Sequence, residues 1–405
     1  MSWEKVKLGE LYTVHNGLSK GSKSFGSGSP FLSFSTVFNN YFIPEELTDL
    51  VQTDDQEQES YSILYGDVFV TRTSETSDEL GMSCVALKDY PKATFNGFTK
   101  RMRPIEKTRV LPEYIGYYMR MPSFRGEFQA FSTMTTRASL KNEDLLSLTI
   151  SLPSMEQQIS IAKNLRIYDA LIKNNQRQIK LLEEASQRLY KEWFIDLRFP
   201  GHENTRIIDG VPEGWIKCTA GDVVDFNPKT PLAKDRIKQS VPMSALSTNS
   251  MILNSNEFTT TESNAGAKFR NGDTLLARIS PCLENGKIAF VSDIDSEEGA
   301  VGSTEFIVMR GKRINQYMVY LLARTAEFHK TAINSMTGSD GRQRAQVDKI
   351  IEFPYLLASQ SILDKFALLV GPLFEQIQNK NKQNKWLSQA RDRLLPKLMS
   401  GEIEV

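Results

Sequence analysis

The segment SMEQQISIAKNLRIYDALIKNNQRQIKLLEEASQRLYKEW, residues 154–193, decides the fold that this sequence predicts. Its apolar residues recur in alternating steps of four and three, which is the a/d heptad pattern of a coiled-coil helix. Ser154 and Gln157 have the spacing of a capping box, so we expect the helix to begin there. The predicted pairing seam of this helix contains Leu165, Ile172, Ile179, Leu182 and Leu189.

The same pattern returns 205 residues later, with seven identities in 18 positions at this one offset. The second seam contains Val370, Ile377, Leu387 and Leu394. Polar residues occupy three mid-helix seam positions, where they fix register at a cost in stability: Asn175, Lys380 and Asn384. We therefore predict two long helices, at about 154–197 and 359–395, that form an antiparallel coiled coil. Pro396 and Gly401 predict the end of the second helix.

Each helix follows a module that is also repeated. GDVFVTR at 66–72 returns as GDTLLAR at 272–278, and EYIGYYMR at 113–120 returns as QYMVYLLAR at 316–324. The first pair predicts short strands entered by a Gly-Asp turn, and the second pair predicts amphipathic helices. The sequence thus predicts an α+β fold with an internal pseudo-twofold repeat, in which two similar globular modules are joined by the two helices. We place the first module at 1–152, the first helix and joint at 153–200, the second module at 201–355, and the second helix and tail at 356–405.

Length and composition exclude several classes of protein. The 405 residues carry 49 basic and 49 acidic side chains, which excludes a histone-like positive charge but not DNA binding. No run approaches 18 consecutive apolar residues and the opening MSWEKVKLGELY has no apolar run, so we expect no membrane span and no signal peptide. Three scattered cysteines fit no zinc or disulfide pattern, and three scattered histidines form no catalytic or metal motif. The scattered cysteines and the missing signal peptide predict a protein of a reducing, cytoplasmic compartment.

Motifs for catalysis on DNA or nucleotides are missing. Neither Gly-Lys pair follows the glycine of a phosphate-binding loop, and no glutamate is followed two residues later by lysine, as nucleases often require. Asn227–Pro228 is followed by Lys229, where an amino-methyltransferase needs a second proline. These absences favour a binding and assembly protein with no catalytic residue, metal site or cofactor of its own.

Basic residues are concentrated in the first module. The stretch 92–141 has ten basic and three acidic residues, whereas 45–59 has seven acids and no base, which indicates a polarised module. Loops that mix Arg, Lys, Ser and Thr are candidates for contacts with phosphates and base edges. The alternative for each loop is an ordinary solvated surface. The candidate DNA-binding residues are Lys20, Lys23, Arg72, Thr135, Thr136, Arg137, Lys229, Thr230, Arg278, Ser339, Arg342 and Arg344.

These features together resemble the specificity (S) subunits of Type I restriction–modification systems. The resemblance covers essentially the whole chain and is most specific in RLYKEWFIDLRFPGHE at the central joint, DGVPEGW opening the second module, and RLLPKLMSGEIEV at the end. It implies two target recognition domains that each read one half of a split sequence in double-stranded DNA, with the helices as a ruler for the spacer. It also implies two methylation (M) subunits that use S-adenosylmethionine to methylate adenine at N6, and restriction (R) subunits that use ATP and Mg. FPYLLASQ at 353–360 departs from ISLPSMEQQ of the first repeat, which leaves the start of the second helix less well defined.

Three hypotheses remain open at this point. The first is a non-catalytic DNA-reading scaffold within a multisubunit complex, where the helices also dock the methylation subunits. The second is a stand-alone DNA-binding regulator with two reading heads. The third is a self-contained enzyme such as a methyltransferase, which the missing motifs disfavour.

Overall fold

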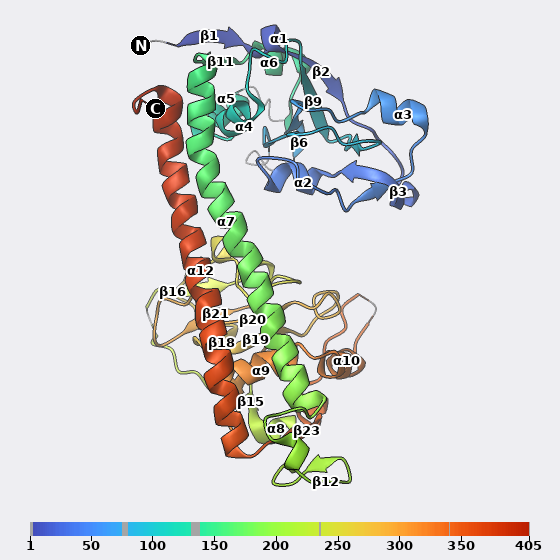
Figure 1. Ribbon diagram of the computed structural model, residues 1–405, viewed down its shortest axis with the longest axis vertical. Helices are drawn as coiled ribbons and strands as arrows, with labels where there is room; N and C mark the ends of the chain where they lie inside the picture. The colour runs from blue at the N-terminus through green and yellow to red at the C-terminus, as the bar shows by residue number, and fades with distance from the viewer. Residues whose placement is uncertain (1–2, 75–79, 131–137, 235, 340, 405) are drawn as a thin grey trace. The chain divides into compact units, whose positions relative to one another are not determined.

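The structure, a computed structural model, describes residues 3–74, 80–130, 138–234, 236–339 and 341–404 (Figure 1). The chain forms two compact units: unit 1 joins residues 1–171 to 386–405, and unit 2 contains residues 172–385. Each unit holds one module and parts of both long helices. This grouping divides each helix between the units, whereas the boundaries predicted from the sequence separate helices from modules; those boundaries remain a prediction.

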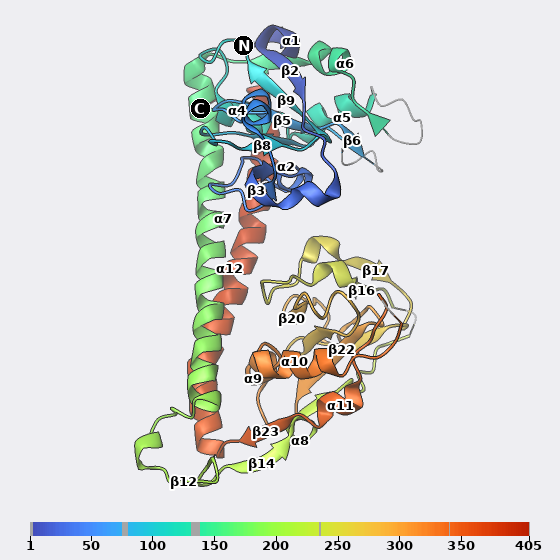
Figure 2. The ribbon, with the colours of Figure 1, turned by 90° about the vertical axis from the view of Figure 1, so that its right-hand side faces the viewer.

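The two long helices are α7 (Met155–Tyr190), which continues into a π-helical turn at Lys191–Ile195, and α12 (Gln360–Ser400) (Figure 2). The predicted capping box at the start of α7 is confirmed. The backbone N–H of Gln157 donates to Ser154 Oγ at 3.3 Å, and the backbone N–H of Ser154 donates to Gln157 Oε1 at 3.2 Å. The helix therefore begins where the sequence places it, because both donors are satisfied locally.

The end of α12 corrects the sequence prediction. Gly401, with φ of 75°, follows the last helical residue, but Pro396 lies inside the helix. Proline removes one backbone hydrogen bond, and burial of the apolar face on both sides of it outweighs this loss: Leu395 before it and Leu398 and Met399 after it are buried in the core of unit 1.

The predicted seams face the interior of the helix pair within each unit. In unit 1, Leu165 near the start of α7 shares a core with Leu395 and Leu398 near the end of α12. In unit 2, Ile179 near the end of α7 shares a core with Val370 and Ile377 near the start of α12. The pairing is therefore antiparallel. The remaining seam residues Ile172, Leu182, Leu189, Leu387 and Leu394 are partly buried.

A polar seam position is satisfied by the facing helix. Asn175 is buried, and its side-chain amide donates to Gln383 Oε1 of α12 at 3.3 Å. A buried amide with one matching partner favours a single register of the two helices.

The module of unit 1 is built on a four-stranded antiparallel sheet with strand order β2-β9-β5-β7. A second pair, β1 with β11, closes the module next to α7. The bounds are β1 (Glu4–Lys7), α1 (Leu8–Leu11), β2 (Tyr12–Asn16), β3 (Phe25–Leu32), α2 (Phe34–Asn39), β4 (Leu50–Val51), α3 (Asp55–Ser60), β5 (Val68–Thr71), β6 (Thr73–Ser74), β7 (Ser83–Val85), β8 (Thr94–Phe95), β9 (Thr99–Pro104), α4 (Pro112–Tyr118), α5 (Pro122–Ala130), β10 (Ala138–Ser139), α6 (Asn142–Ser147) and β11 (Thr149–Leu152).

The module of unit 2 repeats this topology, so the predicted internal repeat is confirmed. Its four-stranded sheet has the order β15-β22-β19-β20, and β14 with β23 replaces β1 with β11. The bounds are β12 (Ile207–Ile208), β13 (Val211–Pro212), β14 (Ile216–Thr219), α8 (Ala220–Val223), β15 (Val224–Phe226), β16 (Lys238–Val241), β17 (Thr259–Thr261), β18 (Ala267–Phe269), β19 (Thr274–Ala277), β20 (Ile288–Phe290), β21 (Ala300–Gly302), β22 (Phe306–Gly311), α9 (Gln316–Ala323), α10 (Ala326–Asn334), α11 (Val347–Ile351) and β23 (Pro354–Leu357).

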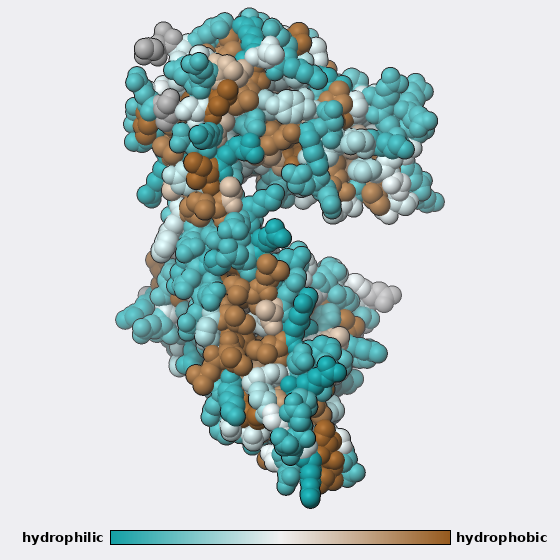
Figure 3. All heavy atoms as spheres, viewed as in Figure 1, coloured by the Kyte–Doolittle hydropathy of each residue, from teal (hydrophilic) through white to brown (hydrophobic). Residues whose placement is uncertain are grey.

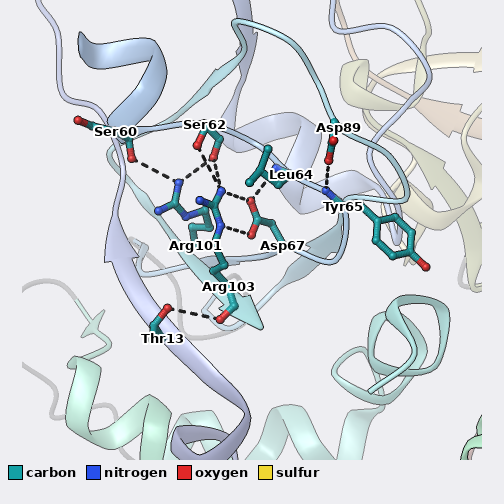
Figure 4. Close-up of polar contacts among 9 residues, drawn as sticks. All are labelled: Thr13, Ser60, Ser62, Leu64, Tyr65, Asp67, Asp89, Arg101 and Arg103. Atoms are coloured by element: carbon teal, nitrogen blue, oxygen red, sulfur yellow. Dashed lines mark hydrogen bonds and ion pairs between the residues drawn. The ribbon is translucent and has the colours of Figure 1, made fainter. Parts of the chain in front are cut away.

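The repeated Gly-Asp turns are held by equivalent ion pairs. Asp67 accepts from Nε and Nη2 of Arg103 at 2.8 and 2.6 Å, beside the guanidinium of Arg101 (Figure 4). Asp273 accepts from Nε and Nη2 of Arg310 at 2.7 Å each. Both aspartates are buried, so each bidentate arginine satisfies a carboxylate at the entrance of the central strand.

Equivalent tyrosines connect each module to α7. In unit 1, Tyr117 donates to Asp169, and Asp169 also forms an ion pair with Arg391 of α12 at 2.6 Å. In unit 2, Tyr320 donates to Glu183 at 2.6 Å, and the backbone N–H of Met251 donates to the same carboxylate at 3.2 Å. The tyrosines repeat, but the carboxylates that they reach come from different turns of α7.

We predict that Glu183→Gln changes the pH dependence of stability. Glu183 is buried, and burial raises the pKa of its carboxyl group above its ordinary value. The folded state thus binds this proton more tightly than the unfolded chain, so stability falls as pH rises from the ordinary carboxyl pKa through the raised one. Glutamine cannot ionise, so the variant should match the parent at acid pH and exceed it at neutral pH in thermal unfolding.

Glu192→Gln is the matched control, because Glu192 is a more exposed carboxylate in the turn that follows α7, 3.9 Å from Arg198. It should leave the pH dependence as in the parent. A stability difference for Glu183→Gln that is the same at every pH would contradict the assignment.

Candidate nucleic-acid interface

Two equivalent arginines follow the central strands of the two modules. Arg72 follows β5 and Arg278 follows β19. The backbone N–H of Arg72 donates to Phe98 O at 3.0 Å, and that of Arg278 donates to Glu305 O at 3.0 Å. The backbone of each arginine is therefore held at the equivalent point of the four-stranded sheet of its own module.

In each module a residue more than 60 positions later along the chain donates a backbone hydrogen bond to the carbonyl of this arginine. The backbone N–H of Leu140 donates to Arg72 O at 2.9 Å, and that of Ala345 donates to Arg278 O at 2.8 Å. In unit 1, β6 also pairs with β10, and in unit 2 Ile279 bridges Arg344. The structure thus brings Arg72–Ser74 beside Ala138–Leu140 in unit 1, and Arg278 and Ile279 beside Arg344 and Ala345 in unit 2.

The side chains of both arginines retain unused donors. Nε of Arg72 and Nε of Arg278 are buried without a hydrogen-bond partner among the described residues. The guanidinium bonds that do form are long, at 3.5 Å from Arg72 Nη1 to Asn16 Oδ1 and at 3.5 Å from Arg278 Nη2 to Ala345 O. Because Nε is buried in both sites, the Nη1 and Nη2 groups of each guanidinium are the donors that suit the bidentate acceptors of a guanine edge or a phosphate.

Lys100 adds positive charge beside Arg72. It is buried and donates to Asn142 Oδ1. Burial first, and the charge of Arg72 second, lower the pKa of Lys100. The sequence analysis did not select Lys100, because nothing in the local pattern places it near the strand end.

Other predicted contact residues have different surroundings. Lys23, Lys229, Ser339 and Arg342 are exposed. Lys20 forms an ion pair with Glu57 at 2.7 Å, and Arg344 is bound by Glu305. Thr135, Thr136 and Arg137 lie outside the described residues. All of these DNA contacts remain predictions.

Thr230 has a structural role in this fold. It is buried, and its hydroxyl oxygen accepts from Arg310 Nη2 at 3.0 Å. Its hydroxyl therefore supports the ion pair of Arg310 with Asp273 and faces away from solvent.

The charge polarity inferred from residues 92–141 needs correction. Arg103 pairs with Asp67, and Arg101 donates to Ser62 O at 2.7 Å. Arg120 donates to three backbone carbonyls at 2.6 to 2.8 Å, those of Ser83, Val37 and Asn40. Together with Lys100, these four cations act inside the module, so the count along the sequence overstates its surface charge.

Two residues beside Arg72 and Arg278 were not among the candidates selected from the sequence. Phe98, 55% exposed, precedes β9, and Glu305 precedes β22. An alignment of the two modules at Arg72 with Arg278, and at β9 with β22, pairs Phe98 with Glu305. The difference between an apolar and an acidic residue at this position is the sequence signal that could have identified both.

No group of His, Cys, Asp and Glu suited to a metal ion occurs among the described residues. Among the same residues, no helix is long and apolar enough to cross a bilayer. The three cysteines are free thiols.

A comparison with family models matches residues 1–184 to the Type I restriction modification DNA specificity domain. The specificity subunit of Type I restriction enzyme MjaIX from Methanocaldococcus jannaschii is 26% identical over 424 residues, covering 100% of this chain and 94% of the relative. The specificity subunit of Type I restriction enzyme EcoAI from Escherichia coli is 31% identical over 182 residues, covering 42% of this chain and 30% of the relative.

The crystal structure of the S subunit of a Type I restriction–modification system from M. genitalium shares the fold. The TM-score is 0.54 at 15% identity, with 98% of this chain and 96% of that chain covered. The matched domain, the full-length relative and the duplicated module with its helix pair agree: in sequence this chain is similar to the DNA-specificity subunits of Type I restriction–modification systems, and it shares the fold of one of them.

Proposed function

We propose that each module reads one half of a split target in double-stranded DNA, and that the paired helices set the length of the unread spacer. The observation that carries this proposal is the duplicated frame around Arg72 and Arg278, with equivalent backbone bonds and unused guanidinium donors in both modules. Two similar readers on one chain suit two half-sites. The hydrogen bond between buried Asn175 and Gln383, which favours one register of the helices, supports the use of the helix pair as a ruler.

We further propose that the outer faces of the helices dock two methylation subunits. Leu181 and Trp386 occupy equivalent positions, 205 residues apart, and their exposed fractions are 54% and 65%. In unit 2, Figure 3 shows apolar side chains gathered on the face that carries the helices, where Leu368 and Leu369 are also exposed. A repeated apolar position suits two copies of one partner.

The chemistry then belongs to the partner subunits. Methylation subunits would supply S-adenosylmethionine and adenine N6 methylation, and restriction subunits would use ATP and Mg in the prokaryotic cytoplasm. The comparisons lend no support to a stand-alone regulator, because the matched relatives are specificity subunits of restriction enzymes.

We predict that the purified chain alone neither methylates nor cuts DNA. Adding the cognate methylation subunits and S-adenosylmethionine should produce N6-methyladenine within a two-part motif, measured by sequencing modified bases in a randomised library. Robust methyl transfer by the chain alone would sink the proposal, as would methylation by the complex without sequence preference.

Arg72→Ala and Arg278→Ala should each affect one half-site only. A lost base contact should cost about 1–3 kcal/mol and relax one position, whereas a lost phosphate contact should weaken binding evenly. Competition binding of the complex with targets mutated in either half distinguishes the two cases. Arg188→Ala, at a side chain that is 83% exposed on α7, is the control. Arg72→Ala and Arg278→Ala relaxing the same half-site would refute the assignment of one module to each half.

Lengthening the helix pair should lengthen the preferred spacer. Four residues inserted after Asn174 in α7, with four after the equivalent Asn379 in α12, add about 6 Å and keep the seams nearly in phase, since one turn takes about 3.6 residues. The gain corresponds to nearly two base pairs at about 3.4 Å each. Both half-site sequences should stay unchanged, and an unchanged spacer in an active complex would show that the helices are not the ruler.

A further inference from the structure

The sites around Arg72 and Arg278 differ in the residue whose backbone carbonyl accepts a hydrogen bond from the arginine backbone N–H. In unit 1 this residue is Phe98, and in unit 2 it is Glu305. Phe98 presents an apolar ring to solvent, with 55% of its surface exposed. Glu305 presents a carboxylate, which is an unusual group at a surface that has to approach DNA phosphates.

Glu305 is held by Arg344 of the neighbouring loop. Nε of Arg344 lies 3.0 Å from each carboxylate oxygen, and Nη2 lies 2.6 Å from Oε1. The Arg344 bonds first, and the charge of Arg278 further down, lower the pKa of Glu305, so the carboxylate is ionised at neutral pH. The side chains remain 22% and 44% exposed, so the pair can still be reached from outside.

The hydrogen-bonding groups of Glu305 and Arg344 together suit the edge of a base pair better than a phosphate. An ionised carboxylate only accepts hydrogen bonds and repels a phosphate, so its partner must be an amino group on a base edge. Adenine places the acceptor N7 beside its amino group, which a carboxylate disfavours, whereas cytosine offers N4. The guanine paired with that cytosine presents the acceptors O6 and N7, which suit the remaining donors of Arg344.

We infer that Glu305 and Arg344 together read one C·G base pair in the half-site of the second module, with Glu305 accepting from cytosine N4 and Arg344 donating to guanine. This inference rests on the proposed function. Arg344 was selected from the sequence as a single DNA contact, whereas the structure makes it one half of a paired reader. In the first module the residue equivalent to Glu305 is Phe98, which has no polar side-chain atom and suits contact with a thymine methyl group.

The test is the methylation motif of the assembled complex with Glu305→Gln and, separately, with Arg344→Gln. Glutamine retains the shape of glutamate but suits adenine, so Glu305→Gln should reduce the preference for C·G at one position by about tenfold and raise A·T there. Arg344→Gln should relax the same position from its guanine side. All other positions of both half-sites should stay as in the parent.

Glu298→Gln is the matched control, because it breaks another ion pair of unit 2, with Arg236 at 3.3 Å, away from the strand end. If the parent complex has no two-part motif, the proposed function itself fails. If the parent motif is present and both variants keep it unchanged, relax different positions, or lose the whole half-site while folded, Glu305 and Arg344 serve structure only and the inference is overturned. Two variants keep the test available if one of them does not fold.

Discussion

The antiparallel pairing of α7 with α12 is the constraint on which the rest of the structure depends. The end of α12 supplies Leu395, Leu398 and Met399 to one core. The same core contains Val6 and Leu8, which lie near the beginning of the chain. The start of α12 supplies Phe366, Val370 and Phe374 to the core of unit 2. Neither core is complete until both helices are in place, so helix pairing and module folding are one problem.

Within each module, a buried aspartate and its bidentate arginine fix the entrance of the strand that ends at the candidate reading site. Breaking a buried ion pair by removing one partner costs about 3–5 kcal/mol, since the other charge is left without compensation. Asp67 with Arg103 and Asp273 with Arg310 therefore hold the frame constant. Next to the opposite ends of these strands, the residues that precede β9 and β22 differ: Phe98 in one module and Glu305 in the other. Under the proposed function, a constant backbone with variable side chains at this edge lets one fold present different chemistry to different base pairs.

The cations of the first module show why charge counts along a sequence mislead. Arg101 satisfies a carbonyl of the loop at Ser62, Arg120 satisfies the carbonyl of Val37 in the last turn of α2, and Arg103 neutralises a buried carboxylate. Such arginines satisfy carbonyls that loops and helix ends leave without a backbone partner. The exposed positive charge of this module is thus carried by fewer side chains than the count along the sequence indicates.

The sequence by itself determined the two helices, the capping box at Ser154, the Gly-Asp turns and the repeat, because periodicity, caps and turns are local properties. Tertiary structure decided what depends on distant neighbours. Pro396 continues the helix because the residues after it are buried in another part of the chain. Thr230 points inward because its hydroxyl accepts a hydrogen bond from Arg310, and Arg103 points inward because it pairs with Asp67. Arg72 meets Leu140, and Glu305 meets Arg344, only because strand pairing brings residues 68 and 39 positions apart to one edge, which no local pattern records.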